Sequence, residues 1–141
     1  MNEPADVVVA VDTSVALPLI LRSHDSFRPV NAALRGHRAR LTGHSLAESY
    51  AVLTRLPGDG RLSPADAARL IDSNFGDPVT LSDRATCDLH RTLSQFKIRG
   101  GAVYDALVGL TAREHRLKLM TRDVRALGTY ALLGVDTQVI S

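Results

Sequence analysis

Five consecutive apolar residues near the N-terminus, Val7–Val11, constrain the fold of this chain most strongly. Four of them are valine, and no polar residue alternates with them, which is the pattern of a strand covered on both faces. Strands of this kind occur in parallel sheets that have helices on either side. We therefore expect this segment to lie at the centre of an α/β domain.

Predicted helices and short strands alternate along the rest of the chain. Helices are expected over residues 15–21, 27–34, 45–56, 83–97 and 102–115, from Pro64 behind Ser63, and in a last segment ending at 133. Short strands are expected over residues 41–42, 79–81, 117–120 and 135–140. This order favours a three-layer α/β/α sandwich around a mostly parallel sheet of four to five strands. Because no linker or repeat interrupts the sequence, we expect one domain over residues 1–141.

The composition narrows the classes of function. Cys87 is the only cysteine, which excludes a disulfide framework and a cysteine-based zinc site. The N-terminus is acidic, and polar residues interrupt the apolar stretch 7–21, so we expect no signal peptide, no membrane span and a cytoplasmic protein. Aromatic residues make up 4% of the chain and tryptophan is absent, which argues against base stacking as the main device of nucleic-acid binding.

Asp12 follows the first predicted strand directly. A structural explanation is that it stabilises the start of the next helix, where an acid interacts favourably with the helix dipole. Thr13 or Ser14 could cap that helix equally well without bringing a carboxylate next to a buried strand. Helix capping alone therefore does not explain why an aspartate occupies position 12.

Glu48 and Asp123 also have structural explanations. Ser45 and Glu48 fit the spacing of a capping box, although Glu48 is the only acid of its predicted helix. Asp123 follows a predicted strand, and it could be a first-turn acid of a helix that Thr121 caps. Neither position identifies a functional group by itself.

Asp105 is the hardest of the acids to explain structurally. Its neighbours three and four positions away are small or apolar, so its face of the helix is expected to pack against the sheet: Gly101, Ala102, Val108 and Gly109. Aspartate is unfavourable in helix interiors, and a buried carboxylate without a partner is costly. If Asp105 is buried, its negative charge must therefore be compensated by a partner group outside its own helix face.

Together the four acids predict a metal site. Asp12 and Asp123 follow strands, while Glu48 and Asp105 lie near helix starts, and in a parallel sheet these ends share one rim. Clustered carboxylates repel one another unless a proton or a cation intervenes. Oxygen ligands alone favour Mg²⁺ or Mn²⁺ over zinc.

The order of these segments resembles the PIN-domain ribonucleases and, among them, the VapC-type toxins of bacterial toxin–antitoxin pairs. The resemblance covers nearly the whole chain and rests on four short segments: "VDTS" at 11–14, "HSLAESY" at 44–50, "YDA" at 104–106 and "TRD" at 121–123. Each segment alone is weakly specific, whereas four in the same order and at similar spacing form a strong signal.

The resemblance implies that the protein hydrolyses RNA phosphodiester bonds with Mg²⁺ or Mn²⁺. Asp12, Asp105 and Asp123 would hold the ion, and Glu48 would be a further ligand or a base. Thr13 and Thr121 would orient the carboxylates; whether Thr13 or Ser14 does so, while the other caps the helix, stays open. Structured RNA such as tRNA is the substrate expected from the family.

The basic residues are strongly biased towards arginine. Lys97 and Lys118 are the only lysines among seventeen basic residues, which leaves fifteen arginines (17 − 2). A GC-rich coding sequence explains this bias, and so does phosphate binding by guanidinium groups. The candidates for RNA contact lie on the predicted face of Glu48 or beside the later acids: Arg55, Arg99, Arg122 and Arg125.

The family resemblance also implies partners. A cognate antitoxin would cover the acidic pocket, and the toxin would form a homodimer. Two apolar sets are candidates for such contacts or for the core: Leu46, Tyr50 and Leu53, and Leu17, Ile20 and Leu21. Alternatives that remain open are a solitary PIN-like RNA-processing nuclease and a non-enzymatic, metal-stabilised protein-binding module.

Two other folds with an acid after the first strand fit the sequence less well. Phosphatases of the haloacid-dehalogenase kind need a second aspartate two residues after the first, and Ser14 occupies that position. Receiver domains need a lysine just after a late strand. Here Lys118 lies at the start of a predicted strand, and Lys97 follows none.

Overall fold

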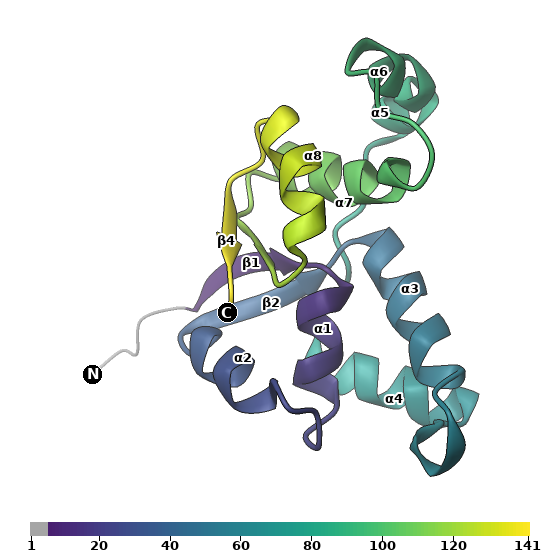
Figure 1. Cartoon of the computed structure of the whole chain (residues 1–141), viewed down its shortest axis with the longest axis vertical. Coiled ribbons are helices and arrows are strands. Elements are labelled where there is room, and N and C mark those ends of the chain that lie inside the picture. The colour runs from purple at the N-terminus through teal and green to yellow at the C-terminus, as the bar shows by residue number, and fades with distance from the viewer. Residues whose placement is uncertain (1–5) are drawn as a thin grey trace.

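A parallel four-stranded sheet forms the centre of the computed structural model, which describes residues 6–141 (Figure 1). The strand order is β2-β1-β3-β4, with every neighbouring pair parallel. The strands are β1 (Val7–Val11), β2 (His37–Leu41), β3 (Leu119–Thr121) and β4 (Thr137–Val139). The predicted α/β fold is confirmed, and β1 has the predicted bounds.

Helices cover both faces of the sheet. They are α1 (Thr13–Ile20), α2 (Phe27–Ala33), α3 (Gly43–Thr54), α4 (Pro64–Asn74), α5 (Asp83–Cys87), α6 (Leu89–Gln95), α7 (Ala102–Glu114) and α8 (Leu127–Leu132). Val9 and Val11 pack into one buried cluster with residues of α1, α2 and α4, whereas Ala10 packs into a second cluster with residues of α7 and α8. Successive residues of β1 thus enter opposite cores, which explains why the strand has no polar position.

Three predicted segments differ from the structure by more than small shifts of their ends. Strand β2 begins at His37 rather than at residue 41, because the edge of the sheet tolerates the polar residues Arg38 and Arg40, and the pairing with β1 is continuous. The strand expected over residues 79–81 is reduced to one parallel bridge between Val79 and Thr42. The helix expected over residues 83–97 is divided at Asp88 into α5 and α6.

The carboxyl ends of the parallel strands meet at one edge of the sheet, and this edge positions the site. Asp12 follows β1, Thr42 follows β2, and Thr121 ends β3. Helices α1 and α3 begin at this edge, with Asp12 and Thr42 in their N-cap positions. Among residues 6–141, no helix is long and apolar enough to cross a membrane.

Candidate active site

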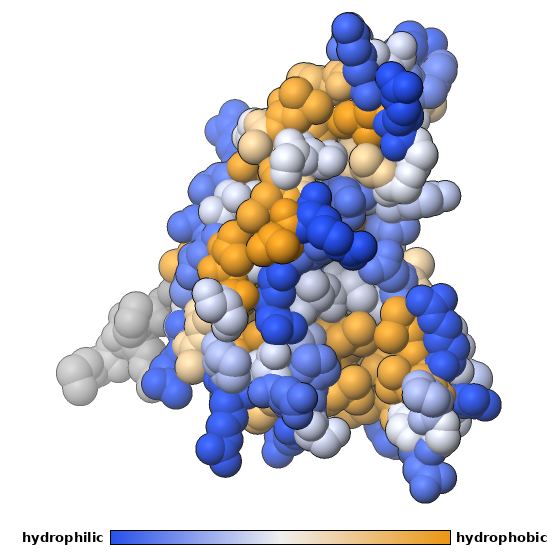
Figure 2. Space-filling model, viewed as in Figure 1, coloured by the Kyte–Doolittle hydropathy of each residue, from blue (hydrophilic) through white to orange (hydrophobic). Residues whose placement is uncertain are grey.

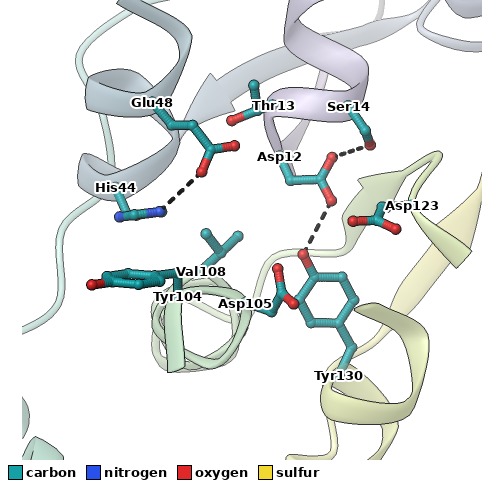
Figure 3. Close-up of a pocket in the computed structure, with 10 residues that line it drawn as sticks. All are labelled: Asp12, Thr13, Ser14, His44, Glu48, Tyr104, Asp105, Val108, Asp123 and Tyr130. Carbon is teal, nitrogen blue, oxygen red and sulfur yellow. Dashed lines mark hydrogen bonds and ion pairs between the residues drawn. The ribbon is translucent and has the colours of Figure 1, made fainter. Parts of the chain in front are cut away.

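A pocket at this edge of the sheet brings together all four acids singled out from the sequence (Figure 3). Its walls come from the start of α1, the first half of α3, the first two turns of α7, the loop after β3, and α8. The lining residues are Asp12, Thr13, Ser14, His44, Glu48, Tyr104, Asp105, Val108, Asp123 and Tyr130. The acids are up to 111 positions apart in the chain (123 − 12), so only the parallel sheet brings them to one rim.

Asp12 is held by three hydroxyl groups. It occupies the N-cap position of α1, but its side chain makes no capping hydrogen bond. Instead Ser14 donates to Oδ1, while Thr121 and, at 3.0 Å, Tyr130 donate to Oδ2. The carboxylate is 7% exposed. The capping explanation for Asp12 is therefore wrong as to its side chain, because the oxygen atoms face the pocket network and not the helix amides.

The network around Asp12 extends into the backbone after β3. Ser14 Oγ accepts a hydrogen bond of 2.8 Å from the Arg122 amide, and Thr121 Oγ1 accepts one of 3.0 Å from the Asp123 amide. The two hydroxyls therefore tie the start of α1 to the loop that carries Asp123. Of the hydroxyl residues predicted to orient carboxylates, Ser14 and Thr121 reach Asp12, and Thr13 lines the pocket.

The electrostatic environment of the pocket opposes its negative charge. Burial raises the pKa of Asp12, the three hydroxyl donors lower it, and the charge of Asp123 raises it again. Burial also raises the pKa of Asp105, and the charges of Asp123, Asp12 and Glu48 add to that effect, while Arg125 opposes it. The neighbouring acids are thus close enough to disfavour the ionised forms of Asp12 and Asp105.

Asp105 and Asp123 occupy the two sides of the pocket opposite α1 and α3. Asp105 lies in the first turn of α7 and is partly buried. Asp123 stands before a single 3₁₀ turn, Val124–Ala126, and its Oδ1 accepts hydrogen bonds from the Arg125 amide and, at 3.2 Å, from Arg125 Nε. Asp123 is therefore itself the N-cap of this turn, and the prediction of a first-turn acid behind a Thr121 cap is wrong. Its Oδ2 has one long contact of 3.4 Å to the same arginine.

Glu48 is the most exposed of the four acids, with 45% of its side chain accessible. The capping box of α3 is formed by Thr42 and Ser45, so the predicted capping role of Glu48 is wrong. Helix α3 begins at Gly43, two residues earlier than predicted, which places Glu48 beyond the first turn. Its contact is with His44 Nε2, one turn back, at 3.2 Å.

Tyr130 is a site residue that the sequence did not reveal. Its side chain is 1% exposed, and its hydroxyl reaches Asp12, whose charge together with burial raises the tyrosine pKa well above its usual range. The ring needs Gly109 on α7, because a Cβ there would lie 3.1 Å from both Tyr130 and Val135. A glycine inside a helix costs about 1 kcal/mol relative to alanine. Gly109 was therefore the sequence feature that could have indicated a close contact on this face of α7.

The donor set suits a hard divalent cation. All four acids supply oxygen, and the neighbouring negative charges that help to raise the pKa values of Asp12 and Asp105 mean that a bound cation would relieve repulsion within the pocket. Over residues 6–141, no three His, Cys, Asp or Glu side chains already converge as an ion site. Magnesium commonly binds through one or two carboxylates and several water molecules, so the separated arrangement fits that ion.

None of the four predicted RNA-contacting arginines lines the pocket itself. Arg125 is 89% exposed and pairs with Asp123, which places it at the rim. Arg122 is partly buried, and its Nε has no hydrogen-bond partner among the described residues. Arg55 and Arg99 are exposed on the end of α3 and on the loop before α7. The structure therefore brings only Arg125 into direct contact with an acid of the site.

The comparison with known proteins agrees with this geometry. The PIN domain family model matches residues 9–131. The chain belongs to the PIN-domain family. It is 56% identical over 131 residues to Ribonuclease VapC27 of Mycobacterium tuberculosis, which covers 93% of this chain and 96% of that protein. The chain thus groups with the VapC ribonucleases, and the PIN-type nuclease predicted from the sequence is confirmed.

Solved structures share the fold of this PIN-domain chain. A crystal structure of VapBC2 from Rickettsia felis bound to a promoter DNA fragment matches with a TM-score of 0.67 at 14% identity, over 96% of this chain and 100% of the other. A toxin–antitoxin complex from Klebsiella pneumoniae matches with a TM-score of 0.62 at 18% identity, over 94% and 96% of the two chains. At these identities the likeness concerns the fold.

Proposed function

We propose that this protein is a divalent-metal-dependent endoribonuclease and the toxin of a toxin–antitoxin pair. Asp12, Asp105 and Asp123 would hold Mg²⁺ or Mn²⁺, and Glu48 would be a further ligand or a base. The observation that carries the proposal is the pocket that gathers four carboxylates from separate parts of the chain, in which burial and the neighbouring acids raise the pKa values of Asp12 and Asp105. On this proposal, residues 1–141 act as one nuclease domain.

The bound ion would supply activation of a water molecule and neutralisation of charge that builds up on the phosphate oxygens. The chain's own residues orient the carboxylates that line the pocket. Ser14, Thr121 and Tyr130 hold the Asp12 carboxylate in one orientation, so no rotation of this group is needed when substrate binds. Glu48 can adjust, because it is exposed and pairs only with His44 on its own helix.

The arginines around the pocket would bind the RNA phosphates. Arg125 lies on Asp123 at the rim, and a phosphate there would compete with Asp123 for the guanidinium group. Arg122, with its unpartnered Nε, is a second candidate beside the pocket. Arg55 and Arg99 are more peripheral and would contact phosphates further along a substrate. Structured RNA such as tRNA is the proposed substrate, in the cytoplasm.

The partner would be a cognate antitoxin, as the names of the structural neighbours suggest. Figure 2 shows apolar surface in the region where α1, α3 and α4 lie, and a hollow there is lined by Leu46, Ala47, Tyr50, Ala68, Ile71 and Asp72. Of the apolar residues considered for contacts, Leu53 and Ile20 are buried in the core, whereas Tyr50 is 37% exposed. This hollow is the proposed contact surface for an antitoxin or for a second toxin molecule.

Cleavage of bulk cellular RNA by purified protein tests the proposal. We expect cleavage with Mg²⁺ or Mn²⁺, none in EDTA, and none when Asp105→Asn replaces the wild type. Asp59→Asn is the matched control, because Asp59 is an exposed acid outside the pocket, and it should cleave like the wild type. Activity that persists in EDTA would exclude the metal mechanism.

The toxin role is tested separately from the nuclease activity. Expression of the protein should arrest bacterial growth, and co-expression of a short reading frame encoded next to it should restore growth. Cleavage without growth arrest would support the alternative of a solitary RNA-processing nuclease. Folded protein with no cleavage under any metal condition would favour the non-enzymatic binding module.

A further inference from the structure

Tyr104 is exposed at the mouth of the acidic pocket. It is 57% accessible although it lines the same pocket as the four acids, and it directly precedes Asp105 on α7. The other large aromatic side chains near the core behave differently: Phe75 is 6% and Tyr130 is 1% exposed. Core packing therefore does not explain why an aromatic ring stands at this position.

The ring of Tyr104 is stacked on the ring of His44. The two centroids are 5.2 Å apart and the planes are inclined by 15°. In Figure 3, His44 lies between the ring of Tyr104 and Glu48. Because Tyr104 is 57% exposed, much of its side chain remains accessible to a ligand at the edge of the pocket.

The plane of His44 is fixed from its other side. Its Nε2 contacts Glu48 Oε2 at 3.2 Å, and only 22% of its side chain is exposed. Helix α3, which carries both residues, starts in a reciprocal capping box between Thr42 and Ser45. His44 is thus held by α3, and Tyr104, the other ring of the stack, is held by α7.

We propose that Tyr104, backed by His44, stacks an unpaired nucleobase of the RNA beside the phosphate that is cut. This inference rests on the ribonuclease function proposed above and adds a substrate-binding residue to it. Aromatic side chains bind bases of single strands by stacking, and such a contact strengthens binding roughly 5- to 100-fold per base. A base in a duplex is already stacked on both faces, so the cut must lie next to an unpaired nucleotide.

The low aromatic content of the chain is consistent with one such position. A sequence with 4% aromatic residues cannot build an extended stacking surface, but one exposed tyrosine at the pocket is sufficient for a single base. The base would sit on Tyr104 while its phosphate approaches the acids and their cation. Tyr104 would then select the nucleotide's unpaired state rather than its sequence, because every base has a flat face.

A competing explanation is that the His44–Tyr104 stack only joins α3 to α7. A purely structural stack would require an aromatic ring for stability and would leave the affinity for RNA unchanged. If Tyr104 stacks a base, loss of its ring would instead weaken the apparent affinity for single-stranded RNA. Phenylalanine at position 104 would keep the ring and therefore the affinity. Kinetics and fluorescence separate the two explanations.

The kinetic experiment compares Tyr104→Leu with Tyr104→Phe on a short single-stranded RNA and on a blunt duplex of the same sequence. We expect the leucine variant to raise KM roughly 5- to 100-fold with a smaller change in kcat, and the phenylalanine variant to keep the wild-type KM. Leu132→Ala is the matched control, because Leu132 is also a large exposed side chain but lies on α8 outside the lining of the acidic pocket. Equal KM values for the leucine and phenylalanine variants would overturn the proposal.

The fluorescence experiment does not depend on cleavage. The chain has no tryptophan, so Tyr104→Trp introduces a single fluorophore; it is placed in the Asp105→Asn background to prevent cutting. Single-stranded RNA should quench its emission, duplex RNA should quench it less, and Leu132→Trp in the same background should not respond. Equal responses at positions 104 and 132 would show that Tyr104 does not stack a base.

The two proposals fail in distinguishable ways. If Tyr104 does not stack a base, Asp105→Asn still abolishes cleavage, while Tyr104→Leu retains the wild-type KM and gives no affinity difference. If the ribonuclease function itself is wrong, Asp105→Asn and the wild type behave alike on RNA, and the Tyr104→Trp signal has no RNA dependence.

Discussion

Asp12 and Glu48 line the same pocket, and they are held in different ways. Asp12 is 7% exposed and accepts hydrogen bonds from three hydroxyls on α1, β3 and α8. Glu48 has 45% of its side chain exposed and contacts one histidine from its own helix. One acid is fixed by tertiary structure, whereas the other is positioned by local helix geometry.

The difference shows that the free-energy cost of placing negative charge in this site falls mainly on Asp12. Burying the Asp12 charge is unfavourable, and the hydroxyl donors offset only part of that cost, since the pKa of Asp12 remains raised. Glu48 stays largely solvated, so holding its charge there costs little. We therefore expect substitutions at Asp12 to change both activity and stability, and substitutions at Glu48 to change mainly activity.

Asp12→Asn should have the largest effect. Loss of a central ligand removes several kcal/mol of charge stabilisation in the transition state, which corresponds to a decrease of roughly 1000-fold or more in kcat/KM. The measurement is RNA cleavage at saturating Mg²⁺ or Mn²⁺, with circular dichroism to show that the variant is folded. A decrease of less than about tenfold would mean that Asp12 is not an ion ligand.

The same variant should melt at a higher temperature than the wild type at pH 7 in EDTA. A raised pKa means that folded Asp12 binds a proton more readily than unfolded Asp12, so its ionised form destabilises the fold above that pKa. As the pH falls through the raised pKa towards the ordinary aspartate pKa of 3.8, the wild type recovers this stability, and the difference in Tm should shrink. A difference that grows on acidification would contradict the burial argument.

Glu48→Gln should have an intermediate effect. An exposed ligand or base that water can partly replace is expected to contribute roughly 10- to 100-fold to activity. Raising the Mn²⁺ concentration should restore part of the loss if Glu48 is a ligand, and none of it if Glu48 is a base. The Tm should stay within about 1–2 °C of the wild type, because the side chain is largely solvated. A large decrease in Tm would remove the contrast with Asp12.

Tyr130→Phe should have the smallest effect on cleavage, because Asp12 keeps its contacts with Ser14 and Thr121. We expect a decrease in activity of about tenfold, the lower end of the range for groups that orient metal ligands. A hydrogen bond to a charged group contributes about 1.5–3 kcal/mol, so the variant should also be less stable. Chemical denaturation measures the second effect, with the exposed Tyr50→Phe as control. Unchanged stability would show that the Tyr130 hydroxyl does not support Asp12.

Local sequence signals predicted the parts of the fold that depend on nearby residues. The valine run gave β1 its bounds, and Ser63 with Pro64 gave the start of α4, because burial pattern and capping chemistry act within a few residues. The strand at His37 was not visible, because its formation depends on pairing with β1 rather than on its own apolar residues. Likewise, the capping box of α3 starts at Thr42, whose position depends on where β2 ends.

The sequence by itself determined that two acids follow strands and two lie near helix starts, at ends that share one edge of a parallel sheet. This order, with the spacing of the four short segments, was sufficient to identify the family. Only the tertiary structure decided how Asp12 is held. The hydroxyl of Tyr130 approaches Asp12 from 118 positions away, and the small size of Gly109 lets it do so. Such contacts join side chains on separate elements, and their distances depend on packing, which no local pattern encodes.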